Sequence, residues 1–142
     1  MGTIDAGAGN HVHSGFSAPV FWRSLSALAL LAMGGIHLYL VFDGVGGVLG
    51  VTFVLNAIGG VVLAIAMPTA PPRLRPLASV LSLLFVVGTL LALVLALTVG
   101  LFGITETLDF TLVPTTLVVE SAGTLVLIVA TVLAFRAQRT HK

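Results

Sequence analysis

Four long runs of apolar residues constrain this chain more than any other feature. They span about residues 20–42, 48–67, 77–102 and 114–135. Each is close to the roughly 20 residues that a helix, rising about 1.5 Å per residue, needs to cross a hydrocarbon layer of about 30 Å. Strands of a membrane barrel would alternate polar and apolar residues, and these runs do not. The sequence therefore predicts an all-α bundle of four transmembrane helices running up-down-up-down.

The scarcity of charge supports this interpretation. Apolar residues make up 58% of the chain and charged residues 8%, with a mean hydropathy of +1.19. A soluble domain is about one quarter charged, because water must stay in contact with its surface. A net charge of +1 offers no basic face to nucleic acid, and the lack of cysteine excludes disulfides and thiol chemistry. The lipid bilayer is thus the expected environment.

The two ends of the chain differ from the apolar runs. Residues 1–19 are small, polar and glycine-rich, which predicts a flexible N-terminal tail. They hold no Lys or Arg, so the basic start of a signal peptide is missing and the first run is expected to remain uncleaved. Residues 136–142 are expected to form a basic cytoplasmic tail.

The positive charges predict the orientation in the membrane. In the predicted topology all six Lys and Arg residues fall on one side: Arg23, Arg73, Arg75, Arg136, Arg139 and Lys142. The two links on the other side carry only Asp43, Glu106 and Asp109, which we interpret as loop charges. The positive-inside rule therefore predicts that both termini are cytoplasmic. Trp22 and Tyr39 lie where interfacial aromatic anchors are expected.

Small residues recur every four positions along the third run. Gly88, Ala92, Ala96 and Gly100 form this stripe, and Gly60 with Ala64 and Ala130 with Ala134 form shorter versions. Such a stripe lets another helix approach closely in lipid, where apolar side chains provide no hydrophobic drive. The stripe predicts helix packing, within the chain or with another membrane subunit.

Three polar residues inside the predicted membrane region are candidates for function. Glu120 lies about 9 Å below the acidic side at 1.5 Å per residue, His37 lies at a similar depth, and Asn56 lies closer to the midplane. A carboxylate at this depth is costly, so it marks either proton or cation exchange or a hydrogen bond that fixes helix packing. His37 and Glu120 could therefore meet, with Asn56 just below, and a hydrogen bond between them is favoured over a haem or metal site. Whether they touch depends on helix rotation, which the sequence does not determine; in the exchange hypothesis Asn56 orients the pair.

Cofactor and metal sites are poorly supported. Haem ligation by two histidines needs a second intramembrane histidine beside His37, and zinc usually takes three or four protein ligands where His37 and Glu120 would supply two. His11 and His13, two apart in the tail, would hold a metal only weakly. The chain lacks G-x-S-x-G, H-E-x-x-H and Walker A motifs. We therefore expect no cofactor, no metal and no enzymatic activity.

Several short segments also carry a resemblance. His37-Leu-Tyr-Leu, Phe53-Val-Leu-Asn56, Gly100-Leu-Phe-Gly-Ile-Thr-Glu106 and Val118-Val-Glu120 occur in this order. Together, over about residues 20–135, they resemble small four-helix integral membrane proteins of actinobacteria that carry no assigned activity. The resemblance implies a multi-pass protein of a bacterial plasma membrane, and it implies no function.

Two functional hypotheses follow. The favoured one is an accessory or assembly subunit of a larger membrane complex, because the chain has packing stripes, little mass outside the membrane and little chemistry. The alternative is a protein that handles protons or ions through Glu120 and His37. Four helices are few for a transporter, so this alternative would require an oligomer.

Overall fold

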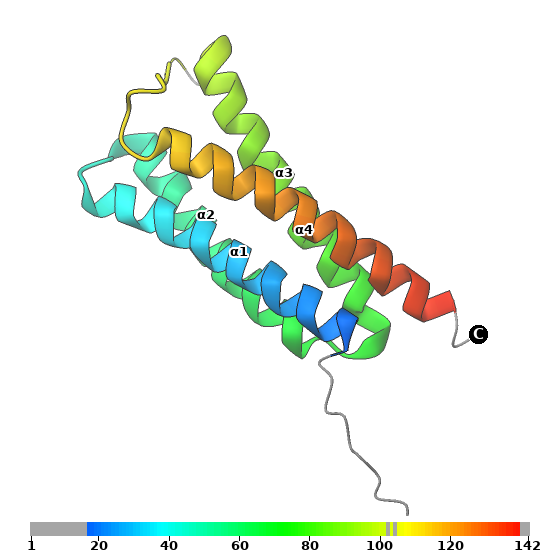
Figure 1. Ribbon diagram of the computed structural model, residues 1–142. Helices are drawn as coiled ribbons and strands as arrows, with labels where there is room; N and C mark the ends of the chain where they lie inside the picture. The colour runs from blue at the N-terminus through cyan, green and yellow to red at the C-terminus, as the bar shows by residue number, and fades with distance from the viewer. Residues whose placement is uncertain (1–16, 102, 104, 140–142) are drawn as a thin grey trace, which may run out of the picture.

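The computed structural model describes residues 17–101, 103 and 105–139. This part of the chain folds into four long antiparallel helices and one short 3₁₀ turn (Figure 1). The helices are α1 (Ala18–Phe42), α2 (Gly47–Thr69), α3 (Arg75–Thr98) and α4 (Val113–Arg139), and the turn η1 (Pro72–Leu74) precedes α3. All four helices are long and apolar enough to cross a membrane. The predicted all-α four-helix membrane fold is confirmed.

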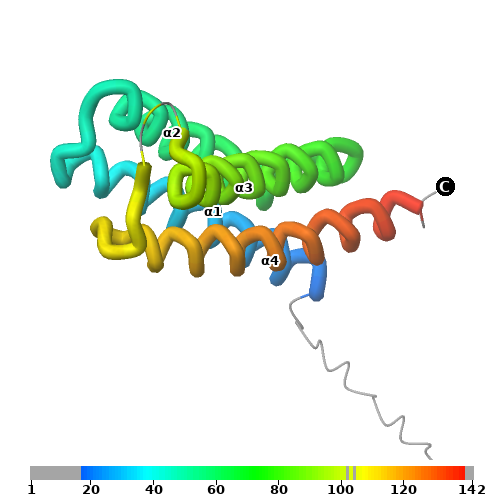
Figure 2. Tube along the Cα trace, turned by 90° about the horizontal axis from the view of Figure 1, so that it is seen from above, coloured from blue at the N-terminus to red at the C-terminus, as the bar shows by residue number. Residues whose placement is uncertain are grey.

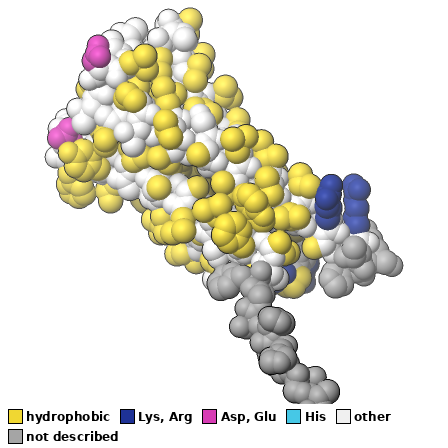
Figure 3. Space-filling model, viewed as in Figure 1, with side chains coloured by type: hydrophobic (Ala, Val, Ile, Leu, Met, Phe, Trp, Pro, Cys, Tyr) yellow, Lys and Arg dark blue, Asp and Glu magenta, His cyan; other side chains and the backbone are white. Residues whose placement is uncertain are grey.

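The outside of the bundle is apolar along its length. Each helix exposes large apolar side chains, including Leu28, Leu55, Leu84 and Leu125, all more than 60% exposed. Figure 3 shows Lys and Arg at one end of the bundle and Asp and Glu at the other. We call these the basic end (Arg23, Arg73, Arg75, Arg136, Arg139) and the acidic end (Asp43, Glu106, Asp109). An apolar exterior between two charged ends suits a multi-pass membrane protein.

Helices α1 and α4 extend into the predicted terminal tails. Helix α1 begins at Ala18, with Pro19 in its first turn, where a missing N–H breaks no helical hydrogen bond. Residues 18 and 19 therefore belong to the helix, and the rest of the predicted N-terminal tail, apart from Ser17, lies outside the described residues. Helix α4 continues to Arg139, so residues 136–139 of the predicted basic tail are helical.

Helix α3 ends at Thr98, four residues before the predicted end of the third span. The reason is Gly100, whose φ of 83° lies in the left-handed region that glycine adopts without steric cost. The Gly100 N–H donates to the Leu95 carbonyl at 2.9 Å and closes the helix. Gly100 is therefore a helix-ending residue and not the fourth member of a packing stripe.

The helices do not pack equally. Helix α1 packs extensively on α2 and on α4, and α4 packs on α3, whereas α2 and α3 make few contacts. A Cβ added at Gly60 of α2 would lie 3.0 Å from the Leu30 carbonyl oxygen, so the α1 and α2 backbones nearly touch. In Figure 1 the yellow-green end of α3 leans away from the cyan parts of α1 and α2, and Figure 2 shows the same bundle from above. The bundle is thus tight on one side and open on another.

The centre of the bundle is closed by apolar side chains. Leu30 and Met33 of α1, Val86 of α3 and Leu127 of α4 are each at most 1% exposed. We call these four residues the apolar layer. They belong to one contiguous core cluster with Ala64, Met67 and Ala130. The apolar layer separates the interior of the acidic half from the interior of the basic half.

Candidate functional site

A cavity of about 180 Å³ lies inside the acidic half of the bundle. All four helices and the α3–α4 link contribute to its lining, and it lies on the side where α2 and α3 diverge. Its polar lining residues are His37, Thr52, Asn56, Thr89, Glu106, Thr116 and Glu120. The three candidates named from the sequence, His37, Asn56 and Glu120, therefore line the same cavity.

Glu120 is the most unusual group in this cavity. Its side chain is 1% exposed, and neither carboxylate oxygen has a hydrogen-bond partner among the described residues. The threonines one turn away on α4 do not supply one. Thr116 donates to the Leu112 carbonyl and Thr124 to the Glu120 carbonyl, each at 2.8 Å. The nearby hydroxyls are thus engaged with the backbone.

An isolated carboxyl group at this depth is unfavourable in either protonation state. An ionised carboxylate inside a membrane costs at least a few kcal/mol. A neutral acid still leaves a donor and acceptors unsatisfied, at about 1–3 kcal/mol. Because neither Glu120 oxygen has a hydrogen-bond partner among the described residues, a proton, a water molecule or a cation that enters the cavity would offset this cost.

His37 is 6% exposed, and its ring packs edge-on against Phe53 with 4.9 Å between ring centroids. The His37 Nδ1 lies 2.9 Å from the Met33 carbonyl oxygen. Since a carbonyl can only accept, Nδ1 carries the hydrogen, and Nε2 remains available to a proton. The expected His37–Glu120 hydrogen bond is not formed, because helix rotation directs the imidazole to its own backbone.

Two threonines add oxygen atoms to the cavity. Thr52 donates to the Leu49 carbonyl at 2.8 Å, and Thr89 donates to the Val86 carbonyl at 2.9 Å. Each hydroxyl oxygen keeps lone pairs that can accept from a ligand or coordinate one. The sequence places both threonines in membrane spans, but only the observed helix rotation places them in the same cavity lining as Glu120. Asn56 is half-buried and adds an amide to the same lining.

Glu106 brings a second carboxylate to the cavity. It is half-buried in the α3–α4 link, and its N–H donates to the Ala96 carbonyl at 3.0 Å, which folds the link back onto α3. The sequence suggested a solvated loop charge, whereas the structure places Glu106 in the lining. Asp109 is exposed and does not line the cavity. Two carboxylates around one small cavity attract positive charge.

The cavity is closed toward the basic end. Met33 lies one helical turn from His37 in that direction, and Val86 lies three residues from Thr89 in that direction. Both belong to the apolar layer, together with Leu30 and Leu127. Glu120 is therefore approached from the acidic end and is separated from the basic end by packed apolar side chains.

The donor set does not resemble a transition-metal site. Among the described residues no three His, Cys, Asp or Glu side chains come together. His11 and His13 lie outside the described residues. Most of the lining is apolar, and the polar atoms within it are mainly oxygen, from carboxylates, hydroxyls and an amide. Oxygen ligands suit protons and hard cations.

The residues of the predicted packing stripe do not form one helix contact in the described chain. Gly88 is exposed, and a Cβ added to it would meet no atom within 4 Å. Ala92 is half-buried and Ala96 is 8% exposed, and both line the cavity. Within this chain the close helix contact is made instead by Gly34 and Gly60.

Comparison with known protein families, curated proteins and solved structures finds no match for this chain. The resemblance to small membrane proteins of actinobacteria therefore stays a prediction. The geometry of the site is the basis for assigning a function.

Proposed function

We propose that this small multi-pass membrane protein binds a proton or a small monovalent cation from its acidic end. The observation that carries the proposal is the Glu120 carboxylate, 1% exposed, without a hydrogen-bond partner among the described residues, and lining a cavity. Buried ionisable groups inside membranes are rare and mark ion or proton sites. Glu120 is the primary ligand in this proposal.

The neighbouring groups support the choice of ligand. Glu106 adds negative charge at the acidic end, while Thr52, Thr89 and Asn56 supply neutral oxygen atoms. The His37 Nε2 can take a proton that Glu120 releases, or repel a cation once protonated. The cavity has room for a few water molecules or one small ligand.

The apolar layer favours binding of the ligand at one face of the membrane over transport of the ligand across it. A continuous pore would need polar groups or water across the whole bundle. The packing of Leu30, Met33, Val86 and Leu127 interrupts such a path. The proposal is therefore binding and release at one face, and transport across the membrane would require these side chains to separate.

A ligand-dependent stability measurement tests the proposal. The purified protein in mild detergent would be melted in Na⁺, K⁺ or NH₄⁺ at constant ionic strength, with a bulky organic cation as the reference. A ligand at 100 times its Kd stabilises the folded state by about 2.7 kcal/mol. Proton uptake on acidification would be followed with an indicator dye.

Two variants decide the outcome. Glu120→Gln keeps the shape of the side chain and should abolish both the cation-dependent rise in Tm and the proton uptake assigned to the cavity. Asp109→Asn removes an exposed carboxylate from the same end outside the cavity and should change neither. A Glu120→Gln protein that responds to cations and protons like the wild type would contradict the proposal.

A second candidate function is an accessory or assembly subunit of a larger membrane complex in a bacterial plasma membrane. The exposed face of α3 favours this candidate, since a Cβ added at Gly88 would meet no neighbouring atom within 4 Å and Leu91 on the same helix is 57% exposed. Native mass spectrometry of the protein extracted from its host in mild detergent tests this candidate. A partner at fixed stoichiometry would support a subunit, and a monomer or homo-oligomer would count against one.

A further inference from the structure

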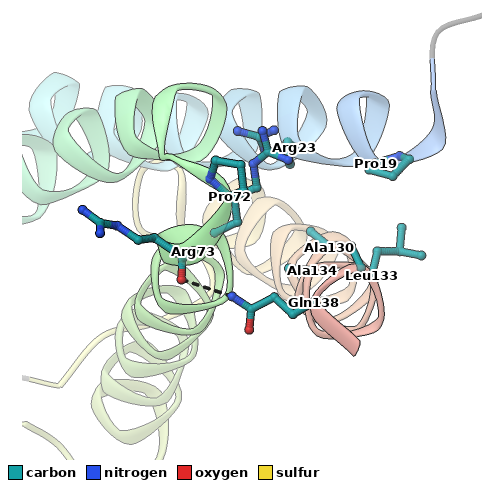
Figure 4. A pocket seen from close by; sticks show the side chains of 10 residues that line it. Pro19, Arg23, Pro72, Arg73, Ala130, Leu133, Ala134 and Gln138 are labelled. Atoms are coloured by element: carbon teal, nitrogen blue, oxygen red, sulfur yellow. Dashed lines mark hydrogen bonds between the residues drawn. The ribbon is translucent and has the colours of Figure 1, made fainter. Parts of the chain in front are cut away.

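A second cavity, of about 520 Å³, lies at the basic end of the bundle. One wall holds three arginines, Arg23, Arg73 and Arg75, with Pro72. The other is formed by α4 and is mainly apolar, with Ala130, Leu133 and Ala134 beside Gln138. Figure 4 shows Arg23 beside Pro72, across from the labelled α4 residues. A cationic wall therefore faces an apolar wall. We call this cavity the basic pocket.

The position of Arg23 follows from the proline spacing after α2. The carbonyls of Met67 and Pro68 would normally accept from the N–H groups four residues later, but those residues are Pro71 and Pro72, which have none. Arg23 supplies the missing donors. Its Nε donates to Met67 O and its Nη2 to Pro68 O, both at 2.8 Å. The guanidinium is thus held at the membrane edge in a fixed orientation.

Arg75 brings a second cation to the same place. Its Nε reaches the Ala70 carbonyl only at 3.4 Å, which is a weak bond. Arg23 and Arg75 are close enough to repel each other. Among the described residues no Asp or Glu lies at the basic end, because Asp43, Glu106 and Asp109 lie at the acidic end and Glu120 lies in the cavity there. The two arginines therefore share a pocket with no acidic partner in the described chain.

We propose that the basic pocket binds the phosphate of an anionic phospholipid, with an acyl chain against Ala130, Leu133 and Ala134. Arginine binds phosphate through fixed, charge-assisted hydrogen bonds, and basic pockets between membrane helices bind anionic headgroups. The apolar wall favours a lipid over free phosphate, because a free anion gains nothing from it. Arg73 is not assigned to the phosphate, since Figure 4 shows its side chain pointing away from the α4 residues.

This site is separate from the acidic-end cavity and does not depend on the function proposed there. The two cavities have no lining residue in common, and the apolar layer lies between them. Loss of cation binding in Glu120→Gln should leave lipid binding unchanged.

Competitive lipid retention, measured by native mass spectrometry, tests the proposal. The full-length protein would be equilibrated with equal amounts of phosphatidylglycerol and phosphatidylcholine with the same acyl chains. We expect preferential retention of phosphatidylglycerol by the wild type and a roughly fivefold lower preference in Arg75→Gln, the usual effect of one cation near an anionic headgroup. Arg139→Gln is the matched control, because Arg139 is exposed at the same end and does not line the pocket.

Each other outcome overturns the assignment. An equal loss in Arg139→Gln would show general surface attraction, and equal retention of both lipids by the wild type would show that no anion site exists. Arg23 is left intact because it also satisfies the α2 carbonyls. A further measurement compares the rise in Tm caused by millimolar inorganic phosphate with that caused by phosphatidylglycerol. If inorganic phosphate raises the Tm as much as phosphatidylglycerol does, the ligand is a free anion and the lipid assignment is wrong.

Discussion

Two neighbouring glycines on α2, Gly59 and Gly60, face different helices and meet different kinds of neighbour. A Cβ at Gly60 would lie 3.0 Å from the Leu30 carbonyl oxygen and 3.5 Å from the Gly34 Cα, so backbone meets backbone between α1 and α2. A Cβ at Gly59 would lie 2.8 Å from the ring of Phe85, so here α2 meets a side chain of α3 and not its backbone. The second interface opens into the acidic-end cavity.

The difference shows how a bundle in lipid can be both stable and open. Helices in a membrane gain little from apolar side chains alone, because lipid provides the same surroundings, and they gain most where small residues allow close backbone contact. The α1–α2 interface is built in that way. The α2–α3 interface has fewer contacts, made by side chains such as Phe85 on Gly59 and Ser79 on Met67, and it leaves space for polar groups. Stability and the candidate site are thus assigned to different helix pairs.

The largest effect is expected from Gly60→Val. The added side chain would press against backbone atoms of α1, which cannot move without separating the helices, so we expect a loss of about 3 kcal/mol or more. Thermal unfolding in mild detergent would measure it. Gly35→Val is the control on α1, where an added Cβ meets no atom within 4 Å. Equal losses in both variants would remove the distinction between the interfaces.

A smaller effect of opposite sign is expected from Glu120→Leu. Leucine fills a similar volume and removes a buried carboxyl group without hydrogen-bond partners, which should stabilise the fold by about 1–3 kcal/mol while abolishing ligand binding. Unfolding curves of the two proteins without added ligand would measure the gain. A clear destabilisation would instead make Glu120 a packing residue and weaken the functional proposal.

Gly59→Ala should cost about 1 kcal/mol or less. The atoms that an added methyl group would meet belong to the Phe85 ring, which can turn toward the open side of the bundle. Gly60→Ala, one residue along, is the matched comparison and should cost more. Melting curves of the two alanine variants in the same detergent would rank them, and the reverse order would contradict our description of the α2–α3 contact.

Gly88→Leu should leave the stability of the isolated chain unchanged within about 0.5 kcal/mol. Gly88 is exposed, and no atom lies within 4 Å of an added Cβ. Any effect should appear only in association with another membrane protein or a second copy, measured by native mass spectrometry. A drop in the Tm of the monomer would mean that this face of α3 packs within the chain.

Much of the fold could be predicted from the sequence because a bilayer imposes simple requirements. Four apolar runs of suitable length predict four spanning helices, and a fixed rise per residue places His37 and Glu120 at similar depth. Depth does not determine rotation about the helix axis. The sequence therefore suggested a His37–Glu120 hydrogen bond, whereas the His37 Nδ1 contacts the Met33 carbonyl.

Other features depend on details that apolar patterns do not contain. In the sequence, Gly100 fits the spacing of the small-residue stripe on the third span. Its left-handed backbone conformation instead ends α3 before the predicted boundary of that span. Gly34 belongs to no repeated small-residue pattern, yet it lies at the closest helix crossing. The contact of Arg23 with α2 could have been predicted from the sequence in part. Pro71 and Pro72 lack N–H groups and therefore leave the Met67 and Pro68 carbonyls without helical donors.

The bond from Arg23 to the last turn of α2 has a consequence for biogenesis. The contacts that join the first two helices, from Arg23 with Met67 at one point to Gly34 with Ala57 at another, lie within residues 18–70. Synthesis proceeds from the N-terminus, so this hairpin can be assembled in the membrane while α3 is still being translated. Helices α3 and α4 then pack against an α1–α2 hairpin that is already formed. The order of synthesis thus sets the order of assembly.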